Sequence, residues 1–454
     1  KSINVGRVMT CVLGMICNRE REIRGFEKTP FYRVMAQTDI AGRIIDTEWK
    51  AVKGSKFFES PLLYKENGFK EKTTAVALIE ALEKHGPVEL ENSDLASELN
   101  VKPPYPLEMT IKSITMKDEK KQAPLLYNLA ELQNDCSKMF KISPDETLNV
   151  VQQLYEAKLV TYPRTDARVL STAVAKEIYK NISGLRNYPQ AGEAAQGALE
   201  LGAYKNIAKT RYTNDKQITD HYAIIPTGQG LGALKGLSLT AQRVYETIVR
   251  RFLSIFYPPA VYQKVSLVTK MENESFFSSF KVLLSEGYLK IAANSFAKKS
   301  MAEASGKTPE SEGEGEVSCD EALLAALQKL KKGDILNING LGIKEGETSP
   351  PKRYNSGSMI LAMENAGQLI EDEDLRSQIK GSGIGTSATR AEILKKLFNI
   401  RYLSLNKKTQ VITPTLQGEM IYDVVNCSIR QLLNPELTAS WEKGLTYVAE
   451  GSIT

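Results

Sequence analysis

The stretch Leu159–Ser171 reads LVTYPRTDARVLS, in which a short apolar start leads into a polar turn. Pro163 fixes its own φ angle and biases Tyr162 away from helical backbone. We therefore predict that Tyr162 lies on a stiff, non-helical turn, from which its phenol projects into a cleft. Arg164, two positions further on, faces the same side when the turn is extended.

A tyrosine and an arginine placed in this way suit phosphoryl transfer. A phenol has an unperturbed pKa of about 10, which makes it a poor nucleophile at neutral pH. A nearby guanidinium favours the phenolate and also binds phosphate oxygens in a fork geometry. The alternative is a buried structural tyrosine, because the chain contains 19 tyrosines. Tyr162 taken alone favours this alternative.

Helical periodicity surrounds the turn on both sides. Apolar residues recur at helical spacing in four stretches, which are 125–140, 146–158, 171–183 and 239–256. Tyr257-Pro258-Pro259 ends this pattern. The sequence therefore predicts a mainly helical domain over residues 121–257, with Tyr162 inside it.

Strand-like alternation lies outside the helical domain. It covers residues 31–53, 107–116, 261–268, 276–284 and 334–343, with polar breaks in the first stretch near Asp39 and Asp46. A helix is predicted over 74–85, and 299–320 has the Ser-, Gly- and Glu-rich composition of a linker. The simplest topology pairs residues 29–120 with residues 258–349 in a β-rich arch, with the helical domain inserted at its tip.

Further helices are predicted at both ends of the chain. Residues 7–26 form an amphipathic pattern, and later helical patterns cover 359–370, 388–397, 416–425 and 439–450, with a hairpin near 402–413. Residues 1–28 and 350–454 would then meet as a third, helical lobe. The predicted fold is multidomain α+β, an arch or ring rather than a row of separate domains.

Composition restricts the class of protein. The 454 residues include 59 basic and 54 acidic side chains, a net charge of +5 that is compatible with nucleic acid but excludes a histone-like coat. Five dispersed cysteines and two histidines argue against a disulfide framework and against zinc sites, and they fit a reducing cytoplasm. The apolar runs are too short for a membrane span.

Five motifs, in order along the chain, resemble those of the type IA DNA topoisomerases, and especially of their topoisomerase III branch. One is the tyrosine motif LVTYPRTDARVLS with the helical segment that precedes it. The others are VGRV at 5–8 with EREIRGF at 20–26, DHYAIIPT at 220–227, PPKRY at 350–354 with Met363-Glu364, and GIGTSATR at 383–390. Because these motifs extend over nearly the whole chain, chance similarity is very improbable.

The resemblance implies a toroidal gate that cleaves and reseals one DNA strand. Tyr162 would form a 5′-phosphotyrosyl link and free a 3′-hydroxyl, and Arg164 would hold the scissile phosphate. The residues that it implies in DNA binding are Arg7, Asp166, His221, Thr389 and Arg390. Such an enzyme relaxes negative supercoils or decatenates DNA with a single-stranded region. It would act as a monomer at the nucleoid, without ATP, because the phosphotyrosine preserves the bond energy.

Two of these motifs keep a structural alternative. His221 taken without its motif is as well explained by a satisfied histidine in a helical core. Gly381, Gly383 and Gly385 precede a helix predicted near Ala388, whose N-terminus can receive a phosphate. A flexible turn explains the same glycines.

The sequence also departs from the family pattern. Met9 stands where the family usually has Gln, and Tyr222 replaces a second His. The metal-binding TOPRIM domain, which the family places before the VGRV motif, has no match, and the acidic stretch Glu371–Arg376 is interpreted as a solvated helix face. We therefore expect a longer parent protein in which the TOPRIM domain lies upstream of Lys1 and supplies the Mg²⁺ ligands.

Other functions fit less well. Gly306-Lys307-Thr308 resembles a phosphate-binding loop, but position 301 is Met where Gly is required, so ATP use is not predicted. A tyrosine recombinase would need a His-x-x-Arg cluster, and a relaxase would need clustered histidines. The main alternative is a non-catalytic module that binds single-stranded DNA and is inactive without the TOPRIM domain.

Overall fold

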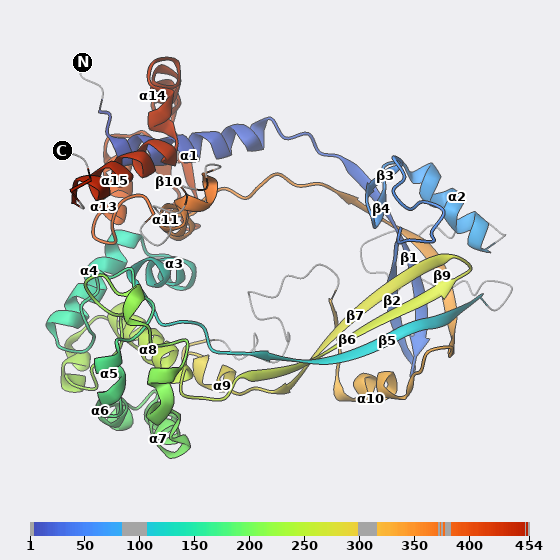
Figure 1. The fold of residues 1–454 in the computed structure, drawn as a ribbon, viewed down its shortest axis with the longest axis horizontal. Helices are drawn as coiled ribbons and strands as arrows, with labels where there is room; N and C mark the ends of the chain where they lie inside the picture. The colour runs from blue at the N-terminus through green and yellow to red at the C-terminus, as the bar shows by residue number, and fades with distance from the viewer. Residues whose placement is uncertain are drawn as a thin grey trace.

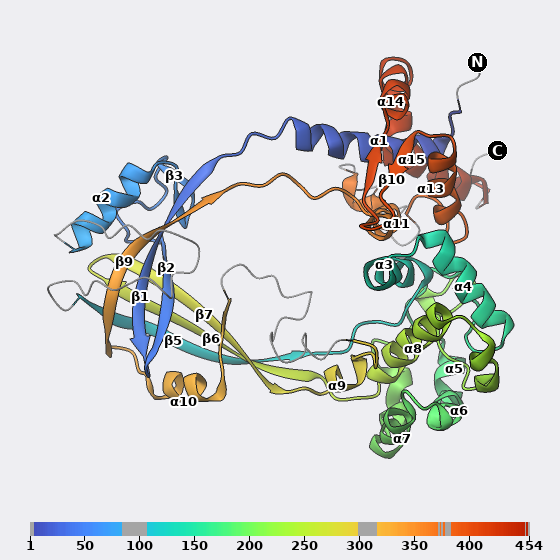
Figure 2. The same cartoon turned by 180° about the vertical axis from the view of Figure 1, so that it is seen from behind.

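The computed structural model describes residues 4–83, 107–297, 316–370, 373, 376, 383–449 and 451–452. The ribbon returns on itself, with groups of helices at one end, a long sheet at the other, and extended segments joining them (Figure 1). Both termini lie at the helical end, as the reverse view also shows (Figure 2). None of the helices in the described ranges combines the length and apolar character that a membrane crossing requires.

The sheet at the far end closes on itself. Its strands run in the order β2-β7-β6-β5-β9-β1-β4-β3, and β2 also pairs with β1, so six strands form a closed circuit. Closure leaves fewer free edges for unwanted pairing. The strand bounds are β1 (Pro30–Ile40), β2 (Arg43–Lys50), β3 (Leu63–Lys65), β4 (Gly68–Phe69), β5 (Leu107–Lys121), β6 (Ala260–Met271), β7 (Glu274–Ser285), β8 (Glu316–Ser318) and β9 (Ile335–Glu347).

The predicted strands are confirmed, but one predicted break is wrong. Asp46 lies in the middle of β2, where its carboxylate accepts a hydrogen bond of 3.0 Å from the Gln37 side chain of β1. The chain instead reverses at Ala41 and Gly42, whose φ angles are 56° and 79°. Two consecutive positive φ angles match the twist that a tight hairpin requires.

Two helices cover the sheet. The helix predicted over 74–85 is α2 (Lys72–Glu83), and residues 84–106 lie outside the described part. The second, α10 (Glu321–Lys329), was not predicted. Asp320 caps its N-terminus, and three leucines on one face pack on the sheet, which are Leu323, Leu324 and Leu327. Of the predicted linker 299–320, residues 316–318 form β8 beside β7, and 299–315 lie outside the described part.

The inserted segment between β5 and β6 is helical, as predicted. Its α-helices are α3 (Leu129–Phe140), α4 (Pro144–Glu156), α5 (Thr172–Glu177), α6 (Tyr179–Gly184), α7 (Gly192–Leu201) and α8 (Leu239–Ser254). A capping box of Ser143 and Glu146 starts α4, and Asn128 caps α3, which therefore begins later than predicted. One apolar core joins these helices.

The two ends of the chain share a second helical core. Helix α1 (Arg7–Arg24) packs against the C-terminal elements, where Cys11, Val12 and Leu13 are buried. These elements are α11 (Ser356–Glu364), α13 (Arg390–Asn399), the hairpin of β10 (Leu403–Leu405) and β11 (Ile412–Pro414), α14 (Leu416–Ser428) and α15 (Pro435–Ala449). Arg353 donates two hydrogen bonds, of 2.8 and 2.9 Å, to the carboxylate of Glu20 and so fastens the segment after β9 to α1.

Candidate active site

Tyr162 lies in an irregular segment between α4 and α5, and residues 223–227 hold this segment in place. The N–H of Thr161 donates to the carbonyl of Ile225 over 3.0 Å. The hydroxyl of Thr161 accepts from the N–H of Ile225 over 3.0 Å and donates to the carbonyl of Ala223 over 3.1 Å. The prediction of a stiff, non-helical turn is therefore confirmed.

Two aromatic rings flank the Tyr162 side chain. The centroid of the His221 ring lies 4.4 Å from that of Tyr162, and the Tyr155 ring meets it edge-on at 5.5 Å. The hydroxyl of Thr165 donates to the carbonyl of His221 over 2.6 Å. The His221 side chain is exposed and lies outside any helix, so the alternative of a histidine in a helical core is wrong.

Arg164 is partly exposed on the same turn. Among the described residues its guanidinium has no hydrogen-bond or ion-pair partner, in contrast to Arg168, which pairs with Glu131 at 2.7 Å. Five N–H donors of Arg164 are therefore available to an anion. This is the state that a phosphate-binding arginine needs.

A polar cluster of two buried and two partly exposed residues follows the turn and joins the inserted helices to the terminal helices. It consists of Asn128, Asp166, Glu364 and Arg390, and we call it the Asn128 cluster. Arg390 donates to the Asp166 carboxylate over 2.6 Å, and the Asn128 amide donates to the carbonyl of Asp166 over 3.0 Å and to the carboxylate of Glu364 over 2.5 Å. Burial raises the pKa of the Glu364 carboxyl, although the Arg390 guanidinium opposes this shift.

Two members of the cluster, Asp166 and Arg390, are residues that were each expected to contact DNA. In this structure they bind each other, and Arg390 is 0% exposed. A nucleic acid has no direct access to this guanidinium in the closed arrangement, and the expected DNA contact of Arg390 stays a prediction.

Arg7 and Thr389 lie at the starts of two of the terminal helices, α1 and α13. Thr389 is exposed at the start of α13, where its hydroxyl accepts from the N–H of Thr386 over 3.0 Å. This helix begins at Arg390, after glycines with positive φ at 383 and 385, while 381 lies outside the described part. The Arg7 guanidinium lies 5.7 Å from the centre of the exposed Trp441 ring.

The whole chain, residues 1–454, matches a family model described as DNA topoisomerase. The chain belongs to the DNA topoisomerase family. Curated relatives named DNA topoisomerase 3, from Bacillus licheniformis and Bacillus subtilis, are 32% and 31% identical over 455 residues. These matches cover 99% of the chain and 54% of each relative, so the chain spans about half the length of the curated relatives it matches. The resemblance inferred from the motifs is confirmed.

A solved structure shares the fold. Full-length topoisomerase I from Thermotoga maritima superposes with a TM-score of 0.62 at 20% sequence identity. The match covers 100% of this chain and 61% of that protein.

Three residues around the Tyr162 turn had no role assigned from the sequence. Tyr155 lies in the helix before the turn, Asn128 caps α3, and Glu364 belongs to the quoted Met-Glu motif. The cap signal of Asn128 was available in the sequence. Its second partner, Glu364, is 236 residues away along the chain, and no local pattern identifies it.

Metal binding finds no support in the described residues. Within them, no group of three or more His, Cys, Asp or Glu side chains could hold a metal ion. Most of the acidic stretch 371–376, the 306–308 motif and the histidine at position 85 lie outside the described part. The His, Cys, Asp and Glu side chains of the described residues therefore do not form a magnesium site.

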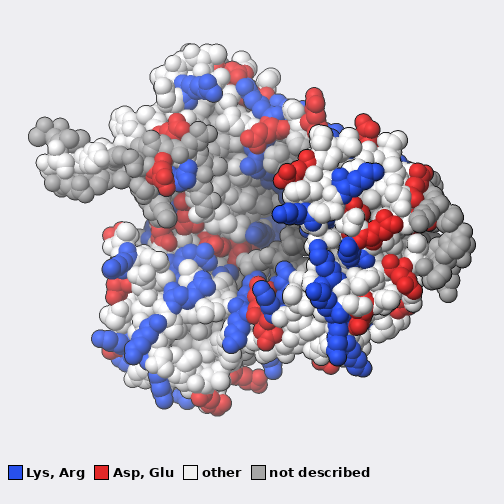
Figure 3. Space-filling view, turned by 45° about the vertical axis from the view of Figure 1, so that its right-hand side comes forward, with Lys and Arg blue, Asp and Glu red and all other residues white. Residues whose placement is uncertain are grey.

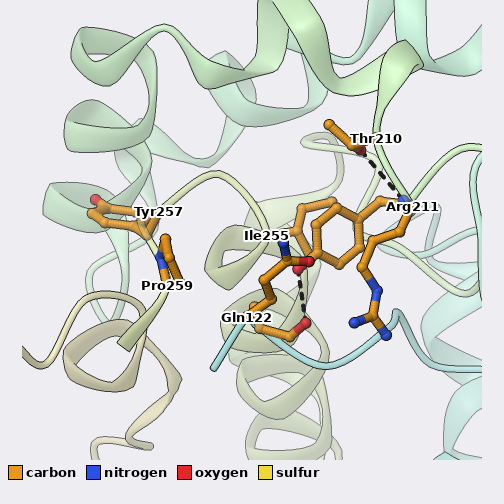
Figure 4. A pocket seen from close by; sticks show the side chains of 8 residues that line it. Gln122, Thr210, Arg211, Ile255, Tyr257 and Pro259 are labelled. Carbon is orange, nitrogen blue, oxygen red and sulfur yellow. Dashed lines mark hydrogen bonds between the residues drawn. The ribbon is translucent and has the colours of Figure 1, made fainter. Parts of the chain in front are cut away.

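A pocket of about 340 Å³ lies where the inserted helices join the sheet (Figure 4). The residues labelled around it are Gln122, Thr210, Arg211, Ile255, Tyr257 and Pro259. Beside it, the hydroxyl of Tyr212 donates to the carbonyl of Ala123 over 2.7 Å. The pocket thus lies beside the two chain segments that connect the inserted helices to the sheet. Tyr162 does not line it.

Basic side chains cross the sheet on the face opposite α10. Lys117, Lys264 and Lys281 are direct neighbours on β5, β6 and β7. Val265 and Phe280, which point the other way, pack with the leucines of α10. In this lysine row, Lys117 and Lys264 are exposed, whereas Lys281 pairs with Glu119 over 3.2 Å, so part of the positive charge is compensated within the sheet. On the face drawn in Figure 3, basic side chains gather in a column and around the central hollow.

Proposed function

We propose that this chain is the strand-cleaving gate of a type IA DNA topoisomerase, with Tyr162 as the nucleophile. The observation that carries the proposal is the hydrogen-bonded turn that presents Tyr162 between His221 and Tyr155, in a chain that matches the topoisomerase family throughout. Arg164 lies on the same turn and has no partner among the residues that the structure describes. If Tyr162 were only a core residue, it would need neither its partial exposure nor an arginine two positions further on that has no partner among the described residues.

The chemistry is a reversible transesterification. The phenol oxygen of Tyr162 forms a bond to the scissile phosphorus, the bond from phosphorus to the 3′ oxygen breaks, the phenol loses a proton, and the leaving 3′ oxygen gains one. Arg164 stabilises the charge that develops on the phosphate oxygens. The reverse reaction reseals the strand. The number of phosphoester bonds is unchanged, so no ATP is needed.

In strand passage, each region of the ring-like fold would have its own role. In this proposal, residues 1–28 and 350–454 form a base lobe that binds DNA, and residues 29–120 and 258–349 form the arch. Residues 121–257 form the tyrosine-bearing lobe. Parting of the tyrosine-bearing lobe from the base lobe would carry the covalently held 5′ end away and open the toroidal gate.

The partners follow from the same proposal. The substrate is single-stranded or negatively supercoiled DNA in the cytoplasm, at the nucleoid, and the chain acts as a monomer. The lysine row supplies a sequence-independent attraction for phosphates. Thr389 and Arg7 add contacts from the base lobe.

Magnesium and the TOPRIM domain enter the proposal through the family resemblance. A bound magnesium ion would help to position phosphate and polarise its oxygens. Because the donors described here do not fit a metal site, we derive no step through the ion and assign its ligands to the TOPRIM domain of a longer protein.

The same observation favours a second candidate, a gate module that binds single-stranded DNA without turnover. The two functions are separated by incubating the chain with labelled single-stranded DNA and magnesium, and then quenching with detergent. A covalent adduct that disappears in Tyr162→Phe supports the enzyme. Salt-sensitive binding without an adduct, in a protein that carries its TOPRIM domain, would favour the binding module.

A further inference from the structure

We propose that Asn128 and Glu364 are positioning residues that couple closure of the tyrosine-bearing lobe onto the base lobe to the placement of the Tyr162 turn. This inference rests on the proposed function of Tyr162. It adds a role that the sequence analysis did not assign, because Asn128 belongs to no motif of the site, and because Glu364, a residue of the Met-Glu motif, acts on the turn from the opposite lobe.

Asn128 is the centre of the arrangement. Its side chain is fully buried and uses both ends of the amide. The oxygen accepts from the N–H of Glu131 over 2.9 Å and so caps α3. The nitrogen donates to the carbonyl of Asp166, in the tyrosine-bearing lobe, and to the carboxylate of Glu364, in the base lobe. One amide therefore touches a helix start, the turn and the opposite lobe.

The end of the turn is fixed next to this amide. The N–H of Leu129 donates to the carbonyl of Thr165 over 3.1 Å, and the hydroxyl of Thr165 donates to the carbonyl of His221. Thr165, which lies between Tyr162 and Asp166, is thus held from α3 and from the histidine segment. A displacement of Asn128 would reach Tyr162 through this short, stiff path.

The base lobe contributes the remaining two members of the cluster. Glu364, at the end of α11, accepts from Asn128, and Arg390, at the start of α13, donates to Asp166. When the lobes part, Asn128 loses one acceptor and Asp166 loses its counter-charge. Water then replaces these protein partners, so the base lobe holds the turn only while the lobes are closed. Cleavage is thereby restricted to the closed gate.

Other contacts between the lobes do not touch the turn and provide a control. On α11 itself, the Ser356 hydroxyl lies 3.0 Å from the Ser137 hydroxyl and 2.8 Å from the side-chain oxygen of Gln410. Ser356→Ala removes a buried contact between the lobes from the same helix as Glu364. It leaves Asn128 and Asp166 unchanged.

Two measurements test the coupling without requiring catalysis. Spin labels on the exposed positions Lys138 and Lys396, in a protein with Cys319→Ser and Cys427→Ser, report the distance between the lobes. Backbone hydrogen exchange in the peptide 159–171 reports the order of the turn. Thermal melting of each variant establishes that it is folded.

Loss of the Glu364 acceptor should loosen a turn in the other lobe. In Glu364→Leu we expect exchange in 159–171 to rise by about tenfold, the scale of one lost charge-assisted hydrogen bond. In Ser356→Ala we expect less than a twofold change at the turn. Glu364→Gln, which keeps a neutral acceptor and fills the same volume, should lie between them. Equal exchange in Glu364→Leu and the unchanged protein would overturn the proposal.

Exchanging the donor and the acceptor of the contact between Asn128 and Glu364 distinguishes coupling of the lobes from a purely structural role. Asn128→Asp keeps the cap on α3 but sets a carboxylate against Glu364, so the distribution of lobe distances should shift to longer values. Adding Glu364→Gln restores a donor across the contact and should return the distances to those of the unchanged protein. A double variant that is as open as Asn128→Asp would contradict the coupling.

The same variants keep the two proposals distinguishable. If the unchanged protein forms the Tyr162 adduct, its yield should fall at least tenfold in Glu364→Leu and should change less than twofold in Ser356→Ala. If no adduct forms even with a TOPRIM domain present, the proposed enzymatic function fails, while the distance and exchange measurements still decide whether the lobes are coupled to the turn.

Discussion

At the scale of single residues, hydrogen bonds from the segment 223–227 give the Tyr162 turn its shape. Thr161 is the residue with the most such bonds, because its hydroxyl bridges an N–H and a carbonyl of that segment. The aromatic contacts to Tyr155 and His221 then fix where the phenol points. A nucleophile on a rigid support loses little conformational freedom when its substrate binds.

The hydroxyl of Thr161 can be removed with little change of shape. We expect Thr161→Val to lower the free energy of unfolding by about 1–3 kcal/mol, because the N–H of Ile225 loses its buried acceptor. Urea denaturation measures this change, and the adduct yield should fall with it. The control is Thr115→Val at an exposed position of β5, which should stay within about 0.5 kcal/mol. Equal effects at both positions would remove the role given to Thr161.

The contact between Glu20 and Arg353 makes the stability of the protein depend on pH. The two hydrogen bonds from Arg353 hold the pKa of the Glu20 carboxyl below its ordinary value of 4.5. The stabilisation is therefore fully present above that ordinary value and is lost as the pH falls through the lowered pKa of the folded state. Glu20→Gln should lower the free energy of unfolding by about 1 kcal/mol at pH 7, and by progressively less as the pH falls through the lowered pKa of the folded state.

Urea titrations at a series of pH values measure this difference. Glu22→Gln, at an exposed position paired only with Arg19 on the same helix, serves as the control and should change little at either pH. A Glu20→Gln penalty that persists undiminished at pH 3 would show that packing, rather than charge, holds this contact.

At the scale of elements, the close approach of α1 to the residues after α14 depends on one glycine. A Cβ atom at Gly14 would lie 2.2 Å from the carbonyl oxygen of Leu433. Gly14→Ala should therefore destabilise the protein by about 2 kcal/mol, despite the higher helix propensity of alanine. At Gly444 in α15 nothing lies within 4 Å of the added Cβ, so Gly444→Ala should stabilise by about 0.5–1 kcal/mol. Thermal melts that rank the two variants in the reverse order would refute this packing.

Elements with a strong local signal could be predicted from the sequence. The periodicities of α1, α8 and the β6–β7 hairpin were sufficient. The helix expected over 171–183 is instead divided into α5 and α6 at Ile178, and α10 was missed because only nine residues form it. Short helices take most of their stability from tertiary packing, which a local pattern does not contain.

The same limit applies to the site. The turn itself follows from Pro163 and its neighbours, and Tyr162 and Arg164 could be named from it. The pairing of Asp166 with Arg390 spans 224 residues, and the contact of Asn128 with Glu364 spans 236. Such contacts exist only because two helical groups from distant parts of the chain meet. Their residues therefore carried no signal of a shared cluster.

At the scale of the whole molecule, the closed sheet brings three lysines together that lie far apart in the sequence. We expect replacement of Lys117, Lys264 and Lys281 by glutamine to weaken binding of single-stranded DNA. The slope of log K against log salt should fall in magnitude by about 1 to 2, because each phosphate contact to a single strand contributes about 0.7 and Lys281 is already paired with Glu119. Fluorescence anisotropy at several salt concentrations measures the slope.

The control uses three exposed lysines at the end of α10, on the other side of the sheet, which are Lys329, Lys331 and Lys332. Their replacement by glutamine changes the net charge by the same amount and should leave the slope nearly unchanged. Identical slopes for the two triple variants would mean that net charge alone, and no particular face, attracts the DNA.

The proposed function requires that Tyr162 becomes linked to the 5′ side of a broken DNA strand. The most direct measurement uses one oligonucleotide labelled at either end, incubated with magnesium and the protein with its TOPRIM domain, and quenched with detergent. We expect that the 3′ label stays on the protein, that the 5′ label is released, and that the modified peptide contains Tyr162. Retention of the 5′ label, or an adduct that survives in Tyr162→Phe, would contradict it.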